Sequence, residues 1–344
     1  MTILPTDFKY LYGVPESEAV IRSTPEDFQV IESLGFEPEG QGEHVFLYIR
    51  KRGENTDWVA RQLANFAQVS PRDVTYAGKK DRHAVTEQWF CIKFPIKRNL
   101  NWKLFGGDSI EVLEAVRHPR KLRLGTLKGN TFRLCLRQVT DMDALKRRVA
   151  LVEQGGVPNY FGEQRFGFDF GNLYKGIALL KGEIQERQRN KKGIYISAVR
   201  SWLFNQLLSS RIESGLWGRI MDGDALMISG SQSCFVEEKS NDELQERLNN
   251  DAITLTGPLW GRGEMMPTGE AEEWERSTLL QWKGVSDLLE TLSLNQERRA
   301  LKLQPENLKL EQISETECWI EFGLMSGAFA TSVLRELCLT SVSE

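Results

Sequence analysis

Within the stretch YAGKKDRHAVTEQWF, residues 76–90, six ionisable side chains lie between Lys79 and Glu87. Asp81 is the one acid beside four bases, which are Lys79, Lys80, Arg82 and His83. Neighbouring cations keep a carboxylate ionised, and an ionised carboxylate can act as a nucleophile or as a general base. Most charge runs are solvated surface, so a plain turn between two strands is the alternative interpretation.

Patterns for other common chemistries are missing from the sequence. The five cysteines are scattered without a C-x-x-C pair, and the three histidines do not form H-E-x-x-H. The sequence also lacks a P-loop, a strand-linked G-x-G-x-x-G and a G-x-S-x-G serine motif. We therefore expect neither a cofactor nor a metal ion, which leaves carboxylate chemistry.

The elements that must position Asp81 follow a mixed pattern of strands and helices. Short strands are predicted at 28–34, 43–53 and 87–94. A helix is predicted between the second and third of these strands, and it begins near Asn55 or Thr56. Residues 122–139 predict two strands around a Gly129-Asn130 turn, followed by a helix from Asp141 to the double glycine at 155 and 156. An amphipathic helix carries Val199, Trp202, Leu203, Gln206 and Leu207, and a last strand covers Cys318–Phe322. This order is typical of an α+β protein.

Charge is segregated along the chain of 344 residues, although its net charge is only −4. Residues 115–140 hold seven Lys and Arg residues and no acid, and a second basic stretch contains Arg187, Arg189, Lys191 and Lys192. Such a distribution favours a basic groove for a phosphate backbone, although outward-facing cations on exposed strands would give the same count. No signal peptide or membrane-spanning stretch is apparent, so we expect a cytoplasmic protein without a membrane partner.

Five motifs, in order, resemble those of the TruD-type tRNA pseudouridine synthases. They are STPEDFQVIE, YAGKKDRHAVTEQW, LKGNTFRL, GVPNYFGEQRFG and GAFATSVLREL, and together they extend over nearly the whole chain. The resemblance implies the pseudouridine synthase fold, which has a curved, mixed, mainly antiparallel sheet, and an inserted α/β TRUD domain. We expect a discontinuous catalytic domain at 1–155 and 305–344, interrupted by the insert at 156–304.

The resemblance also implies roles for individual residues. The catalytic aspartate of the family corresponds to Asp81, and its substrate-binding residues correspond to Phe28, Asn130, Phe132 and Phe329. Arg22 stands where the family usually has a lysine, and it joins Lys79, Lys80, Arg82 and His83 as a candidate for supporting Asp81 or contacting RNA. Without the resemblance, the phenylalanines could be core residues, and Asn130 could serve only a turn.

The implied activity is isomerisation of uridine to pseudouridine in tRNA, at uridine-13 of the D-arm, without a cofactor or an obligate protein partner. Asp81 could attack C1′ of the ribose or remove the 2′ proton, and the sequence favours neither route. Two other functions stay open: a non-catalytic RNA-binding module, and a glycosidic-bond hydrolase that pairs Asp81 with Glu87.

Overall fold

The computed structural model describes residues 6–342 and divides them into two compact units. One unit, here called the sheet unit, contains Pro15–Gln154, Gln304–Ala330 and the described residues from Leu337 onward. The other, here called the inserted unit, contains Gly155–Leu303 together with residues 6–14 and Thr331–Glu336. The expected insert, 156–304, does not include residues 6–14 or Thr331–Glu336, which were expected in the catalytic domain. The contacts group both segments with the insert.

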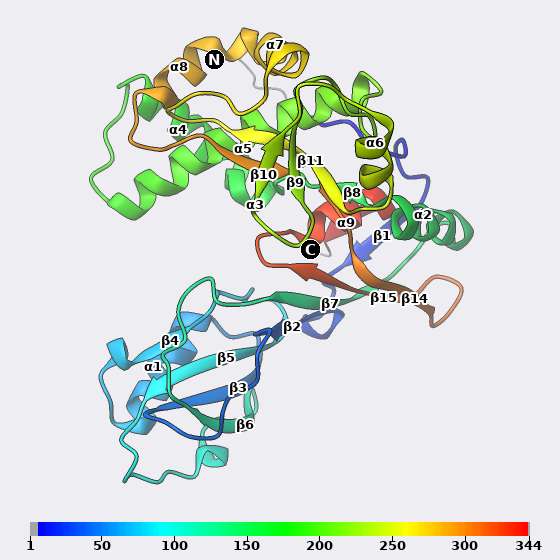
Figure 1. The fold of residues 1–344 in the computed structure, drawn as a ribbon. Coiled ribbons are helices and arrows are strands. Elements are labelled where there is room, and N and C mark those ends of the chain that lie inside the picture. Colours follow the sequence, from blue (N-terminus) through cyan, green and yellow to red (C-terminus); the bar gives the residue numbers. More distant parts are fainter. Residues whose placement is uncertain (1–5, 343–344) are drawn as a thin grey trace. The chain divides into compact units, whose positions relative to one another are not determined.

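An eight-stranded sheet forms the frame of the sheet unit (Figure 1). Its path runs β14-β15-β7-β2-β5-β3-β6, and β4 pairs with β5 beside it. The β2–β5 pair is parallel and the other pairs in this sheet are antiparallel, so the expected mixed, mainly antiparallel sheet is confirmed. The strands are β2 (Phe28–Ser33), β3 (His44–Arg52), β4 (Val74–Tyr76), β5 (Val85–Lys93), β6 (Ile110–His118), β7 (Gly129–Leu136), β14 (Glu306–Gln312) and β15 (Cys318–Met325).

Helix α1 (Thr56–Ala67) closes one face of this sheet. Asn55 is its N-cap and accepts a hydrogen bond from the backbone N–H of Asp57, as the sequence predicts. Val59 and Leu63 recur at helical spacing and are buried in a core that includes Leu47 and Phe90. The sheet unit also contains a parallel pair, β1 (Glu18–Ile21) with β16 (Leu339–Val342), and helix α2 (Met142–Gly155), whose last residue falls in the inserted unit.

The predicted Gly129-Asn130 turn is wrong. Both residues lie in β7, and Asn130 pairs with Glu32 of β2 and with Leu324 of β15. A Cβ at position 129 would lie 2.3 Å from the carbonyl oxygen of Leu324, so the glycine permits close approach of two strands. The residues before it, 119–128, form a loop.

Long helix α5 and a four-stranded antiparallel sheet organise the inserted unit. Helix α5 packs on α4 and on β11, and it buries Val199, Trp202, Leu203 and Leu207 as its periodicity predicts. The helices are α3 (Glu163–Phe166), α4 (Gly171–Leu180), α5 (Arg189–Glu213), α6 (Asp242–Asn249), α7 (Gly269–Thr278), α8 (Lys283–Glu290) and, mostly within this unit, α9 (Ala330–Leu337). The sheet strands are β9 (Ala225–Ile228), β10 (Cys234–Val236), β11 (Ile253–Leu259) and β12 (Glu297–Ala300), and β8 (Val157–Pro158) pairs with β13 (Lys302–Leu303).

Within the described residues, no helix is both long enough and apolar enough to span a bilayer.

Candidate active site

Asp81 lies in the loop between β4 and β5, within the sheet unit. Neighbouring elements hold this loop at several points. The Thr56 hydroxyl accepts a hydrogen bond from the backbone N–H of Lys80 at 3.1 Å, and the Gln88 amide donates to the Gly78 carbonyl at 3.1 Å. The run is therefore a turn between strands, as the alternative interpretation expects, but a firmly anchored one.

Arg22 comes from a distant part of the chain to meet Asp81. It follows β1, and its guanidinium lies 3.0 Å from a carboxylate oxygen of Asp81, whose side chain is 45% exposed. The same guanidinium stacks over the Phe28 ring, 4.0 Å from the ring centroid. Arg22 also adopts a left-handed backbone conformation, φ 59°, which is uncommon for residues other than glycine. Such a partly exposed ion pair adds little to stability, so its main effect is to orient the carboxylate.

Lys51 supports Asp81 from inside the protein. Its side chain is fully buried, and its ammonium donates to the backbone carbonyls of Asp81 at 3.1 Å and Glu54 at 2.8 Å. Burial lowers the pKa of Lys51 to about 8, while the Asp81 and Glu54 charges oppose this shift and Lys80 adds to it. Lys51 thus ties the loop to the segment before α1 and brings positive charge beside Asp81.

Lys51 is absent from the residues expected at this site, although the sequence carries a signal for it. Residues 50–52 are Arg-Lys-Arg in a predicted strand, where successive side chains point to opposite faces. If Arg50 and Arg52 face solvent, Lys51 between them must point into the protein.

Lys80 turns inward and links Asp81 to the expected uracil-binding residue. Its ammonium lies 2.7 Å from a Glu32 carboxylate oxygen and donates to Oδ1 of Asn130 at 2.7 Å. The Glu32 side chain is fully buried and also accepts a hydrogen bond from the backbone N–H of Trp89 at 3.1 Å. A lysine in this position stabilises the interior of the site and does not reach toward a phosphate.

The expected aromatic residues divide into two buried rings and one partly buried ring. Phe28 meets Phe132 edge to face at 6.4 Å between ring centroids, and Phe132 stacks on Phe322 at 5.7 Å. Phe28 and Phe132 are nearly inaccessible, as core residues would be. Phe329 is partly exposed in the segment between β15 and α9, which Ser326 ties to the carbonyl of Lys128 at 3.0 Å.

The other cations of the run lie on the surface. Lys79 pairs with Asp57 at 2.7 Å, Arg82 donates to the Gly53 carbonyl at 3.2 Å, and His83 is exposed.

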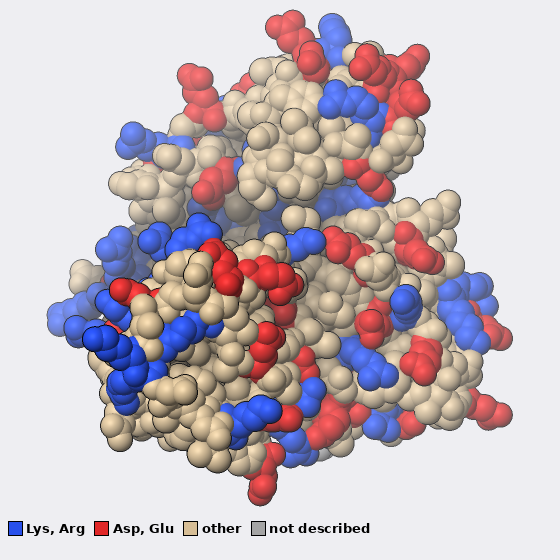
Figure 2. Space-filling model, turned by 60° about the horizontal axis from the view of Figure 1, so that its bottom comes forward, with Lys and Arg blue, Asp and Glu red and all other residues tan. Residues whose placement is uncertain are grey.

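Loop 119–128 lies beside the Asp81 loop. The backbone N–H of Gly125 donates to the Ala77 carbonyl at 2.8 Å, and the Thr75 hydroxyl donates to the Leu122 carbonyl at 2.8 Å. This loop and its end expose four of the seven cations of the first basic stretch, which are Arg120, Lys121, Arg123 and Lys128. Figure 2 shows basic side chains gathered densely at the left of the face that it presents.

Three cations of the first basic stretch have internal roles. Arg117 donates to backbone carbonyls including that of Phe94, Arg133 stacks over Trp319 at 4.5 Å, and Arg137 pairs with Asp27 at 2.8 Å. The sequence count of seven therefore overstates the charge available to a ligand.

Glu87 does not form a carboxylate pair with Asp81. Its carboxylate accepts hydrogen bonds from the Tyr48 hydroxyl at 2.8 Å and from Arg50 at 2.9 Å. The next residue of the strand, Gln88, is the one that contacts the Asp81 loop, and alternate residues face opposite sides of a sheet. This geometry counts against the glycosidic-bond hydrolase.

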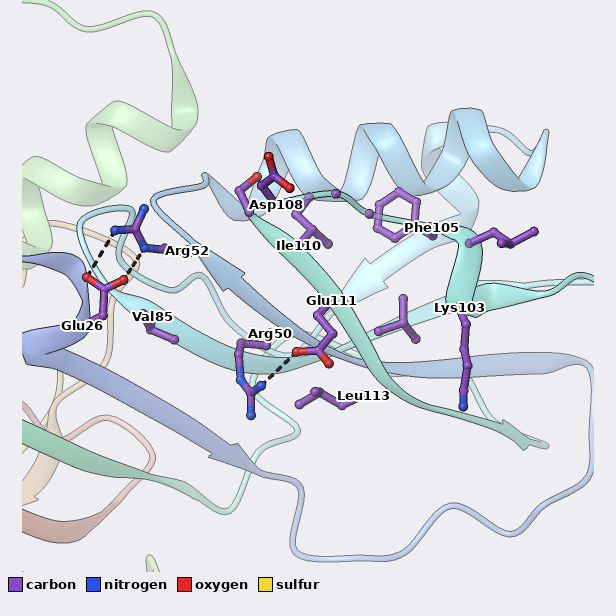
Figure 3. Close-up of a pocket in the computed structure, with 15 residues that line it drawn as sticks. Glu26, Arg50, Arg52, Val85, Lys103, Phe105, Asp108, Ile110, Glu111 and Leu113 are labelled. Atoms are coloured by element: carbon purple, nitrogen blue, oxygen red, sulfur yellow. Dashed lines mark hydrogen bonds and ion pairs between the residues drawn. The ribbon is translucent and has the colours of Figure 1, made fainter.

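A concavity of about 970 Å³ lies elsewhere on the sheet unit, along β3 and β6 (Figure 3). Two ion pairs, Arg52 with Glu26 and Arg50 with Glu111, line it, and Asp81 does not. Because its arginines are neutralised by adjacent carboxylates, it carries no excess charge that would attract a phosphate.

A family model described as tRNA pseudouridine synthase D (TruD) matches residues 7–190 and 180–337. A curated relative named tRNA pseudouridine synthase D, from Aeromonas salmonicida, is 47% identical over 328 residues, which cover 95% of this chain and 93% of the relative. A relative of the same name from Pseudoalteromonas atlantica is 44% identical over 335 residues, covering 96% and 95%.

A solved structure is similar in fold. It is the putative tRNA pseudouridine synthase D from Methanosarcina mazei, with a TM-score of 0.75 and 22% identity over 98% of this chain and 96% of that chain. At this identity the match shows the fold alone.

We predict that Lys51 makes stability depend on pH in the alkaline range. Its pKa of about 8 in the folded protein lies below the ordinary 10.5, so between these values the unfolded chain binds more protons. Stability contributed by this group must therefore rise with pH. Relative to Lys51→Met, the free energy of unfolding of the wild type should increase by up to about 3 kcal/mol from pH 7 to pH 10.5 in urea titrations. Exposed Lys103→Met is the control, and a pH-independent difference for Lys51→Met would contradict the prediction.

Proposed function

Because the chain belongs to the tRNA pseudouridine synthase D family, we propose that it isomerises a uridine of tRNA to pseudouridine, with Asp81 as the reactive carboxylate. The observation that carries this proposal is the Asp81 carboxylate itself, which is accessible, held by Arg22 at 3.0 Å and mounted on an internally anchored loop. We further propose uridine-13 of the D-arm as the target, the cytoplasm as the location, and residues 1–155 and 305–344 as the catalytic domain with 156–304 as its insert.

The reaction requires one ionised carboxylate and no electron transfer. The bond from N1 to C1′ breaks, the uracil turns, a bond forms from C5 to C1′, the C5 proton leaves to solvent, and N1 takes up a proton. Asp81 serves either by attacking C1′ or by removing the 2′ proton. Arg22 and Lys51 both place positive charge near Asp81, and the Arg22 guanidinium orients its carboxylate.

The Lys80–Asn130 contact gives the proposed uracil-binding residue a defined orientation. A lysine ammonium can only donate, so the atom of the Asn130 amide that faces it must be the oxygen. The amide N–H groups then point away from Lys80. Asn130 is therefore set to donate to an acceptor, such as a uracil carbonyl.

The aromatic residues have different proposed tasks. Arg22 already covers one face of Phe28, so Phe28 holds the guanidinium against Asp81. Phe132 stacks on Phe322 and walls the site from within. Phe329 is the more accessible ring and is proposed to stack on the extruded uracil.

We predict that Asp81→Ala abolishes turnover. With tRNA that carries tritium at uracil C5, the wild type should release label to water, and the variant should release it at least ~1000-fold more slowly, since the reactive group is gone. The variant should still bind tRNA, and Asp108→Ala, which removes another exposed acid, should keep wild-type activity.

Full release by Asp81→Ala would refute the role of Asp81. Binding without release by the wild type would instead favour the non-catalytic RNA-binding module. Mass spectrometry of nuclease fragments should place the new pseudouridine at position 13.

A second prediction concerns the orientation of Asn130. Removing Lys80 alone would leave Glu32 as a buried, unpaired charge, so the comparison uses a Glu32→Gln background. There, Lys80→Met and Asn130→Ala should each lower kcat/KM by ~10-fold or more, the value of a charge-assisted hydrogen bond. The double variant should be no worse than the poorer single variant, because both changes remove the same hydrogen bond. Effects that multiply would show that Lys80 and Asn130 act independently.

The basic residues at the start of α5 are proposed to bind phosphates of the tRNA. Replacing Arg187, Arg189, Lys191 and Lys192 with glutamine should weaken tRNA binding and lower the slope of log K against log salt by about one for each phosphate that is no longer neutralised. Filter binding between about 50 and about 300 mM salt would measure this slope. The control replaces cations that pair with carboxylates nearby, Lys239, Arg276 and Lys283. An unchanged slope would remove this segment from the interface.

A further inference from the structure

Phe168 is the most exposed of the large apolar side chains among the described residues, at 92%. It lies in the sequence FGFDF, residues 166–170, whose first two residues are the last two of the GVPNYFGEQRFG motif. This segment belongs to the inserted unit.

The neighbouring phenylalanines explain why Phe168 points outward. Phe166 is buried, and its ring stacks on Phe170 at 5.8 Å between centroids. With the first and last rings of FGFDF stacked on each other, the middle ring is directed toward solvent.

The backbone of this segment is strained in a way that fixes its shape. Asp169 and Phe170 are consecutive residues with left-handed φ values of 47° and 57°. Residues other than glycine rarely adopt this region, and such strain concentrates at functional sites. A Cβ on Gly167 would lie 2.8 Å from the Asn172 side chain, so the turn is also packed tightly against the start of α4. The fold therefore presents Phe168 on a stiff support.

The segment that follows this ring is basic. Residues 171–192 contain six Lys and Arg residues and two glutamates, and all six cations are exposed; Lys175 lies in α4 and the other five come after that helix. Protein partners usually cover a wide apolar patch, whereas proteins that bind single-stranded nucleic acid combine exposed aromatic rings, which stack on bases, with exposed cations that follow the backbone.

We propose that Phe168 stacks on a nucleobase of the tRNA, outside the uridine that is isomerised, and so contributes to substrate binding. This inference rests on the proposed function, because it takes tRNA as the substrate. Stacking on an aromatic side chain accepts any base, so Phe168 would add affinity and little sequence preference.

The test compares Phe168→Ala and Phe168→Trp with Leu280→Ala, a control that removes another apolar side chain of the inserted unit, 63% exposed. Tritium-release kinetics should show KM raised about 5- to 100-fold by Phe168→Ala, the range for loss of one base stack. Its kcat and melting temperature should stay unchanged because the side chain touches neither the reacting atoms nor the core. Phe168→Trp should restore KM, and Leu280→Ala should leave it unaltered.

Photo-crosslinking tests the stacking directly. With p-benzoylphenylalanine in place of Phe168, irradiation should attach the full-length chain to tRNA, and the same group in place of Leu280 should not. An unchanged KM for Phe168→Ala, or a crosslink to a second copy of the chain in place of RNA, would overturn the inference. If the wild type releases no tritium, the proposed function fails, and tRNA binding with crosslinking alone then decides whether Phe168 contacts RNA.

Discussion

The buried ammonium of Lys51 holds the loop on which the rest of the site depends. Asp81 lies in no helix or strand, so regular hydrogen bonding does not fix its position. Lys51 donates to the Asp81 carbonyl, and Lys80, the preceding residue, reaches inward to Glu32 and Asn130. Two buried cations thus hold the loop at residues 80 and 81. Burying them is costly unless each is paired or hydrogen-bonded, and here the carbonyls, Glu32 and Asn130 supply the partners.

The basic residues next to Asp81 in the sequence divide into one that stabilises the interior of the site and three that stay on the surface. Of the four cations next to Asp81, Lys80 serves the interior, whereas Lys79, Arg82 and His83 stay at the surface. The cations that act on Asp81 itself, Arg22 and Lys51, come from distant segments. Lys79 is paired with Asp57, whereas loop 119–128 exposes cations in the same unit as the carboxylate that we propose reacts.

Much of the fold could be predicted from local patterns. The spacing of Val59 and Leu63 indicates α1, Asn55 indicates its start, and the apolar last strand at Cys318 indicates a sheet formed with earlier strands. The prediction of a turn at Gly129-Asn130 is wrong because glycine occurs both in turns and where two strands approach closely. Only the neighbouring carbonyl of Leu324 shows that the second reason applies here.

Prediction of the site was limited in a similar way. Motifs predict roles for Asp81, Phe28, Asn130, Phe132 and Phe329, but they do not reveal which cations face inward. Lys51 depends on the register of β3, and the pairing of Lys80 with Glu32 requires β2 and the Asp81 loop to be neighbours. Both are long-range features, so composition and spacing alone do not contain them.

If a uridine of tRNA reacts at Asp81, a crystal structure of the Asp81→Asn variant bound to tRNA should capture it beside that residue. We expect an extruded uridine whose C1′ or C2′ lies within roughly 3.5 Å of the residue 81 side chain, the distance expected of reacting atoms. Its uracil should accept a hydrogen bond from the Asn130 amide. An extruded uridine bound away from residue 81, or tRNA bound with every base stacked in place, would contradict the account.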